Sequence, residues 1–329
     1  MTIENLINII GGNIINSPKV KKIESATIYY SKVELGDLFF ATENENIDKA
    51  VENGAYAIVF EGENPKILDS EIVYIKVDSI LEASNKFLRY VIAQKEAQIY
   101  HFEDIELSLL KQISFRKSTI FTILDNNWQK NFETILNSNY DIYITDNKEY
   151  AKTIFPQYKK HKNLAHGYIV SDSLLKTTFR LGKFVYQDIE IAPFFIDNLR
   201  KVASFCEEKD IDYDIARVKY TKEFKPYFVD KNLNIVQKGT SERVLIFIST
   251  LDIIEKSINY LKHDGRWVKR LTLTPPNTKL NSEDRPTWYE NSKEAQEILK
   301  NNHFHYAFCY KLSLEDIVNK DSINPTLFE

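Results

Sequence analysis

Apolar residues recur at helix and strand spacings in turn, and this alternation predicts an α/β fold. Ile3, Leu6, Ile7 and Ile10 follow one face of a helix, and Gly11 ends it. Further helices are predicted at 47–53 and at 79–94, where Asp78 can cap the start. Runs of strand length lie between these helices, at 26–30, 37–41, 56–60 and 72–77. The first region therefore reads as one α/β domain.

The same alternation continues through the middle of the chain. Strands are predicted at 98–102, 119–124, 140–145 and 165–170, with helices at 105–113, 128–136 and 148–155. Short strands joined by helical crossovers predict a second, mainly parallel sheet. A hairpin then turns at Gly182, and Pro193 begins a helix that ends near Lys209.

The last third contains a smaller α/β region. It comprises a strand at 243–248, a helix at 251–262, a strand at 267–273, a polar stretch with two prolines at 275 and 276, then a helix and a strand at 303–312. A chain of 329 residues exceeds the usual size of one core. We therefore predict a multi-domain α/β protein with domains at 1–95, 96–210 and 211–329.

Composition narrows the class of protein. The chain is 43% hydrophobic and 27% charged, and its net charge of -4 predicts no nucleic-acid partner. It has no apolar run of the roughly 20 residues that a bilayer span needs, which predicts no membrane insertion. Two distant cysteines and an N-terminus without a basic, apolar leader predict a cytoplasmic protein.

Four stretches of the first domain share the order and spacing of a known family. They are Leu6–Gly12 (LINIIGG), Ser31–Ala41 (SKVELGDLFFA), Ala50–Val59 (AVENGAYAIV) and a strand that ends at Val77-Asp78 before a long helix. Together they cover about a quarter of the chain. They resemble the N-terminal domain of the MurE and MurF kind of Mur ligase, enzymes that add amino acids or dipeptides to UDP-N-acetylmuramoyl peptides.

The resemblance implies a site for a uridine nucleotide in this first domain. It places Tyr30, Ser31 and Lys32 at that site, with Phe40 and Thr42 beside them. The family has an arginine where Lys32 stands, and lysine lacks the planar fork that binds phosphate in two-pronged fashion. The family also has a longer loop after Ala41, whereas residues 42–46 here are short and acidic and would repel a diphosphate.

A second departure concerns ATP. Mur ligases begin their central domain with a glycine-rich loop and a lysine that hold the ATP phosphates. At that place the chain has no glycine, and Glu103, Asp104 and Glu106 occupy the start of the next helix. The nearest substitute, residues 116–119 (RKST), also lacks glycine. The resemblance, with this change, implies a shortened central domain, no ATP-dependent ligation and no cofactor.

Other residues suggest chemistry that the resemblance does not cover. His303, His305 and Cys309 have the parity of one strand face, but we expect no metal site because the wetter face of such a strand accommodates histidines without one. His101 beside Glu103 suits acid–base chemistry or a structural role at a strand end.

Two polar segments are candidates for binding. Residues Lys238, Gly239, Thr240, Ser241 and Arg243 offer amides, hydroxyls and cations to an anion, or simply form a tight turn before a strand. Residues 285–289 (RPTWY) bring a cation and two aromatic rings to a polar loop, where they recognise a ring or a partner, or anchor the loop.

The leading functional hypothesis is a degenerate Mur ligase-like protein with a binding or regulatory role. Its partner would be a UDP-linked peptidoglycan precursor or an enzyme of cell-wall synthesis. The alternatives are an ATP-independent enzyme that uses the former ligase cleft and a divergent UDP-N-acetylmuramoyl-peptide ligase. Ancestry cannot choose among them, because function resides in sites and not in folds.

Overall fold

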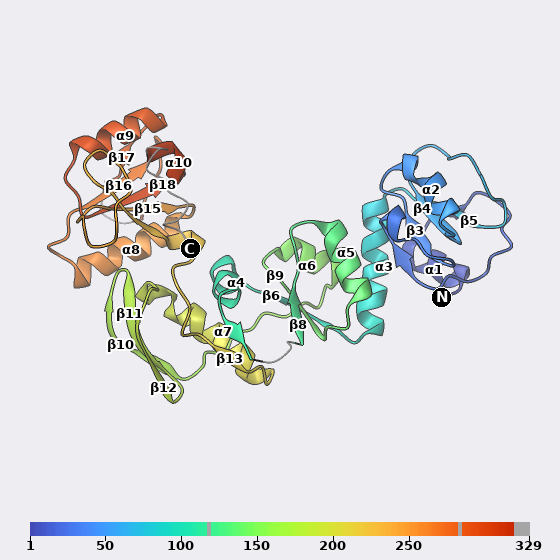
Figure 1. The fold of residues 1–329 in the computed structure, drawn as a ribbon, viewed down its shortest axis with the longest axis horizontal. Coiled ribbons are helices and arrows are strands. Elements are labelled where there is room, and N and C mark those ends of the chain that lie inside the picture. Colours follow the sequence, from blue (N-terminus) through green and yellow to red (C-terminus); the bar gives the residue numbers. More distant parts are fainter. Residues whose placement is uncertain (117–119, 282–284, 319–329) are drawn as a thin grey trace. The chain divides into compact units, whose positions relative to one another are not determined.

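The computed structural model describes residues 1–116, 120–281 and 285–318, and the chain forms two compact units (Figure 1). The first unit consists of Met1–Glu103 and Ser118–His161. The second consists of Asp104–Lys117 and Lys162–Glu329, so the chain passes between the units three times. Both units mix helices with sheets, and over the described chain most strand pairs are parallel, which confirms the predicted multi-domain α/β class. The boundaries near residues 95 and 210 stay a prediction.

The first sheet of unit 1 has five strands and helices on both faces. Its order is β1 (Asn13–Ile14), β5 (Val73–Lys76), β4 (Ala57–Phe60), β3 (Leu38–Phe40) and β2 (Ala26–Thr27), and β1 alone pairs antiparallel. Leu38 and Phe40 face α1 (Ile3–Ile10) and α3 (Ile80–Gln94), whereas Phe39 faces α2 (Ile47–Glu52). Because both faces are covered, the strands are apolar without alternation.

Helix α3 joins the two sheets of unit 1. The helix begins after Ser79, whose side chain accepts the amide of Glu82, so Ser79 and not Asp78 is the N-cap. It also packs against α5 (Trp128–Asn137) and α6 (Lys148–Ile154). The rings of Phe40, Phe87 and Phe132 meet here at centroid distances of 5.2 to 6.3 Å. One continuous core therefore serves both sheets.

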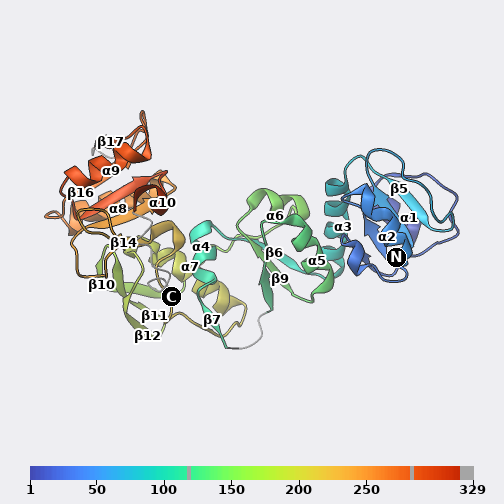
Figure 2. The same cartoon turned by 45° about the horizontal axis from the view of Figure 1, so that its top comes forward.

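The second sheet of unit 1 is wholly parallel, in the order β6 (Gln98–His101), β9 (Ile142–Thr145), β8 (Phe121–Ile123). Figure 2 shows these strands with α5 and α6 beside them. The predicted strand at 165–170 is not part of this sheet. It belongs to β10 (Gly167–Ser173), which pairs antiparallel with β11 (Lys176–Leu181), followed by β12 (Phe184–Ile189). Two residues join β10 to β11, and so short a connection permits only antiparallel pairing.

Unit 2 combines this hairpin sheet with helices and a C-terminal sheet. Helix α4 (Asp104–Leu110) packs on α7 (Ile196–Glu208), and β7 (Ser114–Phe115) pairs with β13 (Tyr213–Asp214). The C-terminal sheet has the order β14 (Pro226–Phe228), β15 (Val244–Ile248), β18 (Tyr306–Tyr310), β16 (Arg270–Thr274), β17 (Thr287–Trp288). Its strands are parallel except β14.

Helices cover both faces of the C-terminal sheet. Helix α9 (Ser292–Asn301) and α10 (Leu314–Ile317) share a core with β15, β16 and β18, and α8 (Leu251–Asp264) lies on the other side (Figure 1). Among the described residues, no helix is long and apolar enough to cross a membrane.

Candidate functional site

The residues predicted to hold a nucleotide lie after β2, in a single 3₁₀ turn, Tyr30–Lys32. The Lys32 ammonium is 3.2 Å from Oε2 of Glu133 on α5 and lies over the Tyr29 ring, 5.1 Å from its centroid. Ser31 is exposed, and the backbone carbonyl of Tyr30 accepts a hydrogen bond from the Asn53 amide. The one cation of this turn is therefore already paired with a carboxylate.

Glu133 is buried and accepts four hydrogen bonds. Its Oε1 accepts the Thr27 hydroxyl at 2.7 Å and the Ile28 amide at 3.0 Å. Its Oε2 accepts Lys32 and the side-chain amide of Asn137, each at 3.2 Å. This network ties β2 and the 3₁₀ turn to α5, and it holds the Lys32 ammonium beside a carboxylate.

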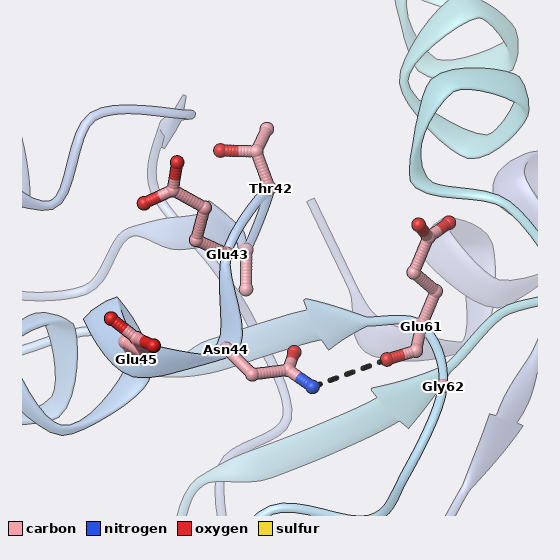
Figure 3. A pocket seen from close by; sticks show the side chains of 7 residues that line it. Thr42, Glu43, Asn44, Glu45, Glu61 and Gly62 are labelled. Carbon is pink, nitrogen blue, oxygen red and sulfur yellow. Dashed lines mark hydrogen bonds between the residues drawn. The ribbon is translucent and has the colours of Figure 1, made fainter.

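A cavity of about 650 Å³ opens at the loops that follow β3 and β4 (Figure 3). It is lined by Ala41, Thr42, Glu43, Asn44, Glu45, Glu61 and Gly62. Thr42 is among the lining residues, and its role at a nucleotide site stays a prediction. Phe40 is fully buried against the rings of Phe87 and Phe132 and is not among the lining residues.

The electrostatics of the cavity disfavour anions. Three of its lining residues are glutamates, and no lysine, arginine or histidine is among the lining residues. Oε2 of Glu61 accepts the first amide of α3, from Ile80, at 2.7 Å, while Glu43 accepts the Asn46 amide at 3.2 Å. A diphosphate placed here would face like charges, whereas cations and N–H donors would find acceptors.

The junction that the resemblance assigns to the ATP phosphates is short. Strand β6 ends at His101 and α4 begins at Asp104, which leaves only Phe102 and Glu103 between them. Phe102 is buried, and its amide donates to the Thr145 carbonyl at 3.0 Å. A phosphate loop needs several free amides and glycines that let the backbone approach the anion. This junction has no glycine, and its Phe102 amide is already bonded.

Charged groups at this strand end pair with one another. Glu103 Oε1 lies 3.1 Å from the Lys160 ammonium and 3.9 Å from Nδ1 of the buried His101. The Nε2 of His101 is 3.2 Å from the carbonyl of Asp146. Of the substitute loop at 116–119, residues 117–119 lie outside the described part of the chain.

Most side-chain polar groups of the second predicted anion site bond within the protein, whereas Nε of Arg243 is buried without a hydrogen-bond partner. Arg243 donates to the carbonyls of Leu299 and Asn302 at the end of α9, and it lies over the Phe304 ring. The other members are also engaged: Lys238 pairs with Glu190, the Thr240 hydroxyl donates to Gln237, and the Ser241 hydroxyl donates to Val229. The anion site stays a prediction, and these contacts compete with it.

The two histidines and the cysteine near the C-terminal strand do not have the environment of a shared metal site. His303 and His305 have ring centroids 5.5 Å apart, and Nδ1 of His305 accepts the Lys269 amide. Cys309 is fully buried in the core, where burial raises the pKa of its thiol and disfavours the thiolate that metals bind. Within the described ranges, no group of three or more potential metal-binding side chains occurs.

In the aromatic loop at 285–289, Tyr289 is buried and anchors the loop, whereas Trp288 is exposed. The Tyr289 hydroxyl donates to the Tyr310 carbonyl at 2.7 Å, and Tyr289 is buried. Trp288 is 52% exposed at the edge strand β17. Tyr289 therefore anchors the loop, and the recognition role of Trp288 stays a prediction.

Sequence patterns did not reveal Glu133. It lies in a helix between apolar residues, and nothing nearby in the sequence identifies its partner, because Thr27 and Lys32 are about 100 positions away. A lone acidic residue beside the apolar stripe of a helix is the one signal available, and such residues are usually solvated.

The strand orders and sheet faces described above define a multi-domain α/β protein, and comparison with known proteins specifies the fold. No family model and no curated protein matches the chain. Among solved structures, MurF from Acinetobacter baumannii shares 11% identity over 96% of each chain, with a TM-score of 0.51. A MurF ligase from Thermotoga maritima, in complex with ADP, shares 12% identity over 89% of this chain and 95% of that chain, with a TM-score of 0.50. The chain is therefore Mur ligase-like in fold, as the resemblance predicted.

Proposed function

We propose that this protein is a degenerate Mur ligase-like binding or regulatory protein of peptidoglycan precursor synthesis that does not perform ATP-dependent ligation. The observation that carries the proposal is the two-residue junction between β6 and α4. Its amide at Phe102 is already bonded, and its charged residue, Glu103, is an anion. A triphosphate has no cradle at this position.

The N-terminal cavity supports a change of ligand or partner. In the family, the matching segment holds a uridine nucleotide. Here Lys32 pairs with Glu133, and the cavity at the loops after β3 and β4 carries Glu43, Glu45 and Glu61. A ligand that presents ammonium or amide N–H groups suits this cavity better than a diphosphate does. The peptide part of a peptidoglycan precursor and a basic segment of an enzyme of cell-wall synthesis both present ammonium or amide N–H groups.

Thermal unfolding with added ligands tests the proposal. We expect no shift with ATP and magnesium, and a shift with either UDP-N-acetylmuramoyl peptides or a purified Mur enzyme. A ligand at 100 times its Kd stabilises the folded state by about 2.7 kcal/mol, which a melting curve resolves. Glu43→Gln combined with Glu45→Gln should weaken the interaction, and Lys66→Gln, an exposed charge change elsewhere, serves as the matched control. Magnesium-dependent ATP turnover would overturn the proposal.

A second candidate is an ATP-independent enzyme, and the observation that favours it is the cluster of His101, Glu103 and Lys160 at the end of β6. Parallel sheets bind ligands beyond the carboxyl ends of their strands. A histidine beside a carboxylate there has the components of a general base. If turnover of a muramoyl peptide without nucleotide were found and lost in His101→Gln, this candidate would replace the binding role.

A further inference from the structure

A second, smaller cavity of about 210 Å³ lies on the outer face of α3, where α6 approaches it. It is lined by Ser79, Leu81, Glu82, Asn85, Lys86, Arg89 and Thr153. All of these residues belong to unit 1. Pockets for drug-sized ligands are usually larger, about 300 Å³ and more, so this cavity suits a smaller molecule.

Asn85 provides a buried polar group in this cavity without a partner. The residue is only 7% exposed, and its Oδ1 has no hydrogen-bond partner. Leaving a buried acceptor unpaired costs about 1 to 3 kcal/mol, so such groups are normally satisfied by protein, water or ligand. The terminal torsion of an asparagine is soft, and rotation about it lets the oxygen meet a donor in the cavity.

Charges of both signs surround Asn85. Glu82 and Lys86 form an ion pair at 2.8 Å, and the hydrogen bond from Lys86 lowers the pKa of the Glu82 carboxyl. Arg89 donates from Nε to the Thr153 carbonyl at 2.5 Å, a bond that leaves the Nη donors of its fork for other acceptors. The lining thus contains amide and carboxylate acceptors together with the cationic groups of Lys86 and Arg89.

We propose that this cavity binds a small α-amino acid. The ammonium group would donate to Asn85 Oδ1 and to Glu82, and the carboxylate would accept from Arg89 and Lys86. Leu81, which is 46% exposed, offers an apolar surface to a short side chain. The inference is independent of the proposed function, because the cavity is a different one and shares no lining residue with the acidic cavity at Ala41–Glu45.

Calorimetric titration of the full-length chain tests the proposal with three probes. L-Alanine carries both charges, L-lactate replaces the ammonium by a hydroxyl, and glycine betaine has no N–H donor. We expect binding of L-alanine, at least tenfold weaker binding of L-lactate, and none of glycine betaine. No heat with L-alanine up to about 10 mM would overturn the proposal, as would equal affinity for all three probes.

Two variants separate the site from general effects on folding. Asn85→Leu should abolish L-alanine binding and leave the melting temperature of the ligand-free protein unchanged or higher, because it removes an unpaired buried group. Arg89→Gln, at an exposed position, should weaken binding at least tenfold. Lys66→Gln removes a charge elsewhere and should bind normally. Unchanged affinity for L-alanine in both Asn85→Leu and Arg89→Gln would mean that L-alanine binds at another site, and it would refute the proposal.

Discussion

The buried side chain of Glu133 accepts hydrogen bonds on which the stability of the first unit depends. Its four donors come from β2, the following turn and α5, so its loss leaves the Thr27 hydroxyl and the Ile28 amide unpaired in a buried place. We predict that Glu133→Leu lowers the free energy of unfolding by about 3 kcal/mol. Urea denaturation measures this change.

Substitutions of Lys32, the ion-pair partner of Glu133, and of Glu45, a control position, should change the free energy of unfolding less than Glu133→Leu does. Lys32→Met should cost only about 1 kcal/mol or less, because the lysine side chain is 56% exposed and water screens the pair. Glu45→Gln, at an exposed position of the acidic cavity, should stay within about 0.5 kcal/mol of the parent. A larger loss for Lys32→Met than for Glu133→Leu would contradict the network as described.

Asp316 makes one local part of the stability depend on pH. Hydrogen bonds from the Ser313 hydroxyl and backbone amide lower the pKa of this carboxyl below its ordinary value. Because the folded pKa is depressed, its contribution to stability is present above the ordinary value and is lost as pH falls through the lower, folded value. Carboxyl NMR titration should find the low midpoint, and Ser313→Ala should raise it. An unchanged midpoint in that variant would refute the capping arrangement.

At the scale of elements, the hairpin sheet depends on a close approach at Gly167. A Cβ placed there would lie 2.4 Å from the Arg180 carbonyl oxygen of the neighbouring strand. We predict that Gly167→Ala destabilises unit 2 by about 2 kcal/mol through overpacking, measured by thermal or urea unfolding. Ser171→Ala, exposed on the same strand, is the control and should have little effect. Equal effects would mean that β10 shifts freely along β11.

The elements themselves were largely predictable, since apolar spacing places most helices and strands within a few residues. Strands β1, β7, β13, β14 and β17 were not predicted, because runs of two or three residues show no periodicity. Strand β10 was placed in the wrong sheet, because an apolar run at 165–170 carries no information about the direction of its partner. The two-residue connection after Ser173 decides that direction. The candidate sites were less predictable. Phe40 and Arg243 have the right chemistry in the sequence, but contacts with Phe87, Phe132 and the end of α9 engage their side chains.

At the scale of the whole molecule, each unit has a hydrophobic core of its own. We therefore predict two calorimetric unfolding transitions. Glu133→Leu should lower the midpoint of one transition, and Arg243→Met, which removes the donors at the end of α9, should lower the other. A single transition that both variants shift equally would mean that the units unfold together.

Residues 104–117 belong to unit 2 although the chain around them builds unit 1, and this has a consequence during synthesis. The leucines at 107, 109 and 110 are covered in the folded protein, where α4 packs on α7. Helix α7 begins about 90 residues later, at Ile196, and ribosomes add about 5 to 20 residues per second. For roughly 5 to 20 seconds the apolar segment at 104–117 is therefore exposed in the nascent chain beside a nearly complete N-terminal unit. We expect a chaperone that binds this nascent chain to bind at residues 104–117.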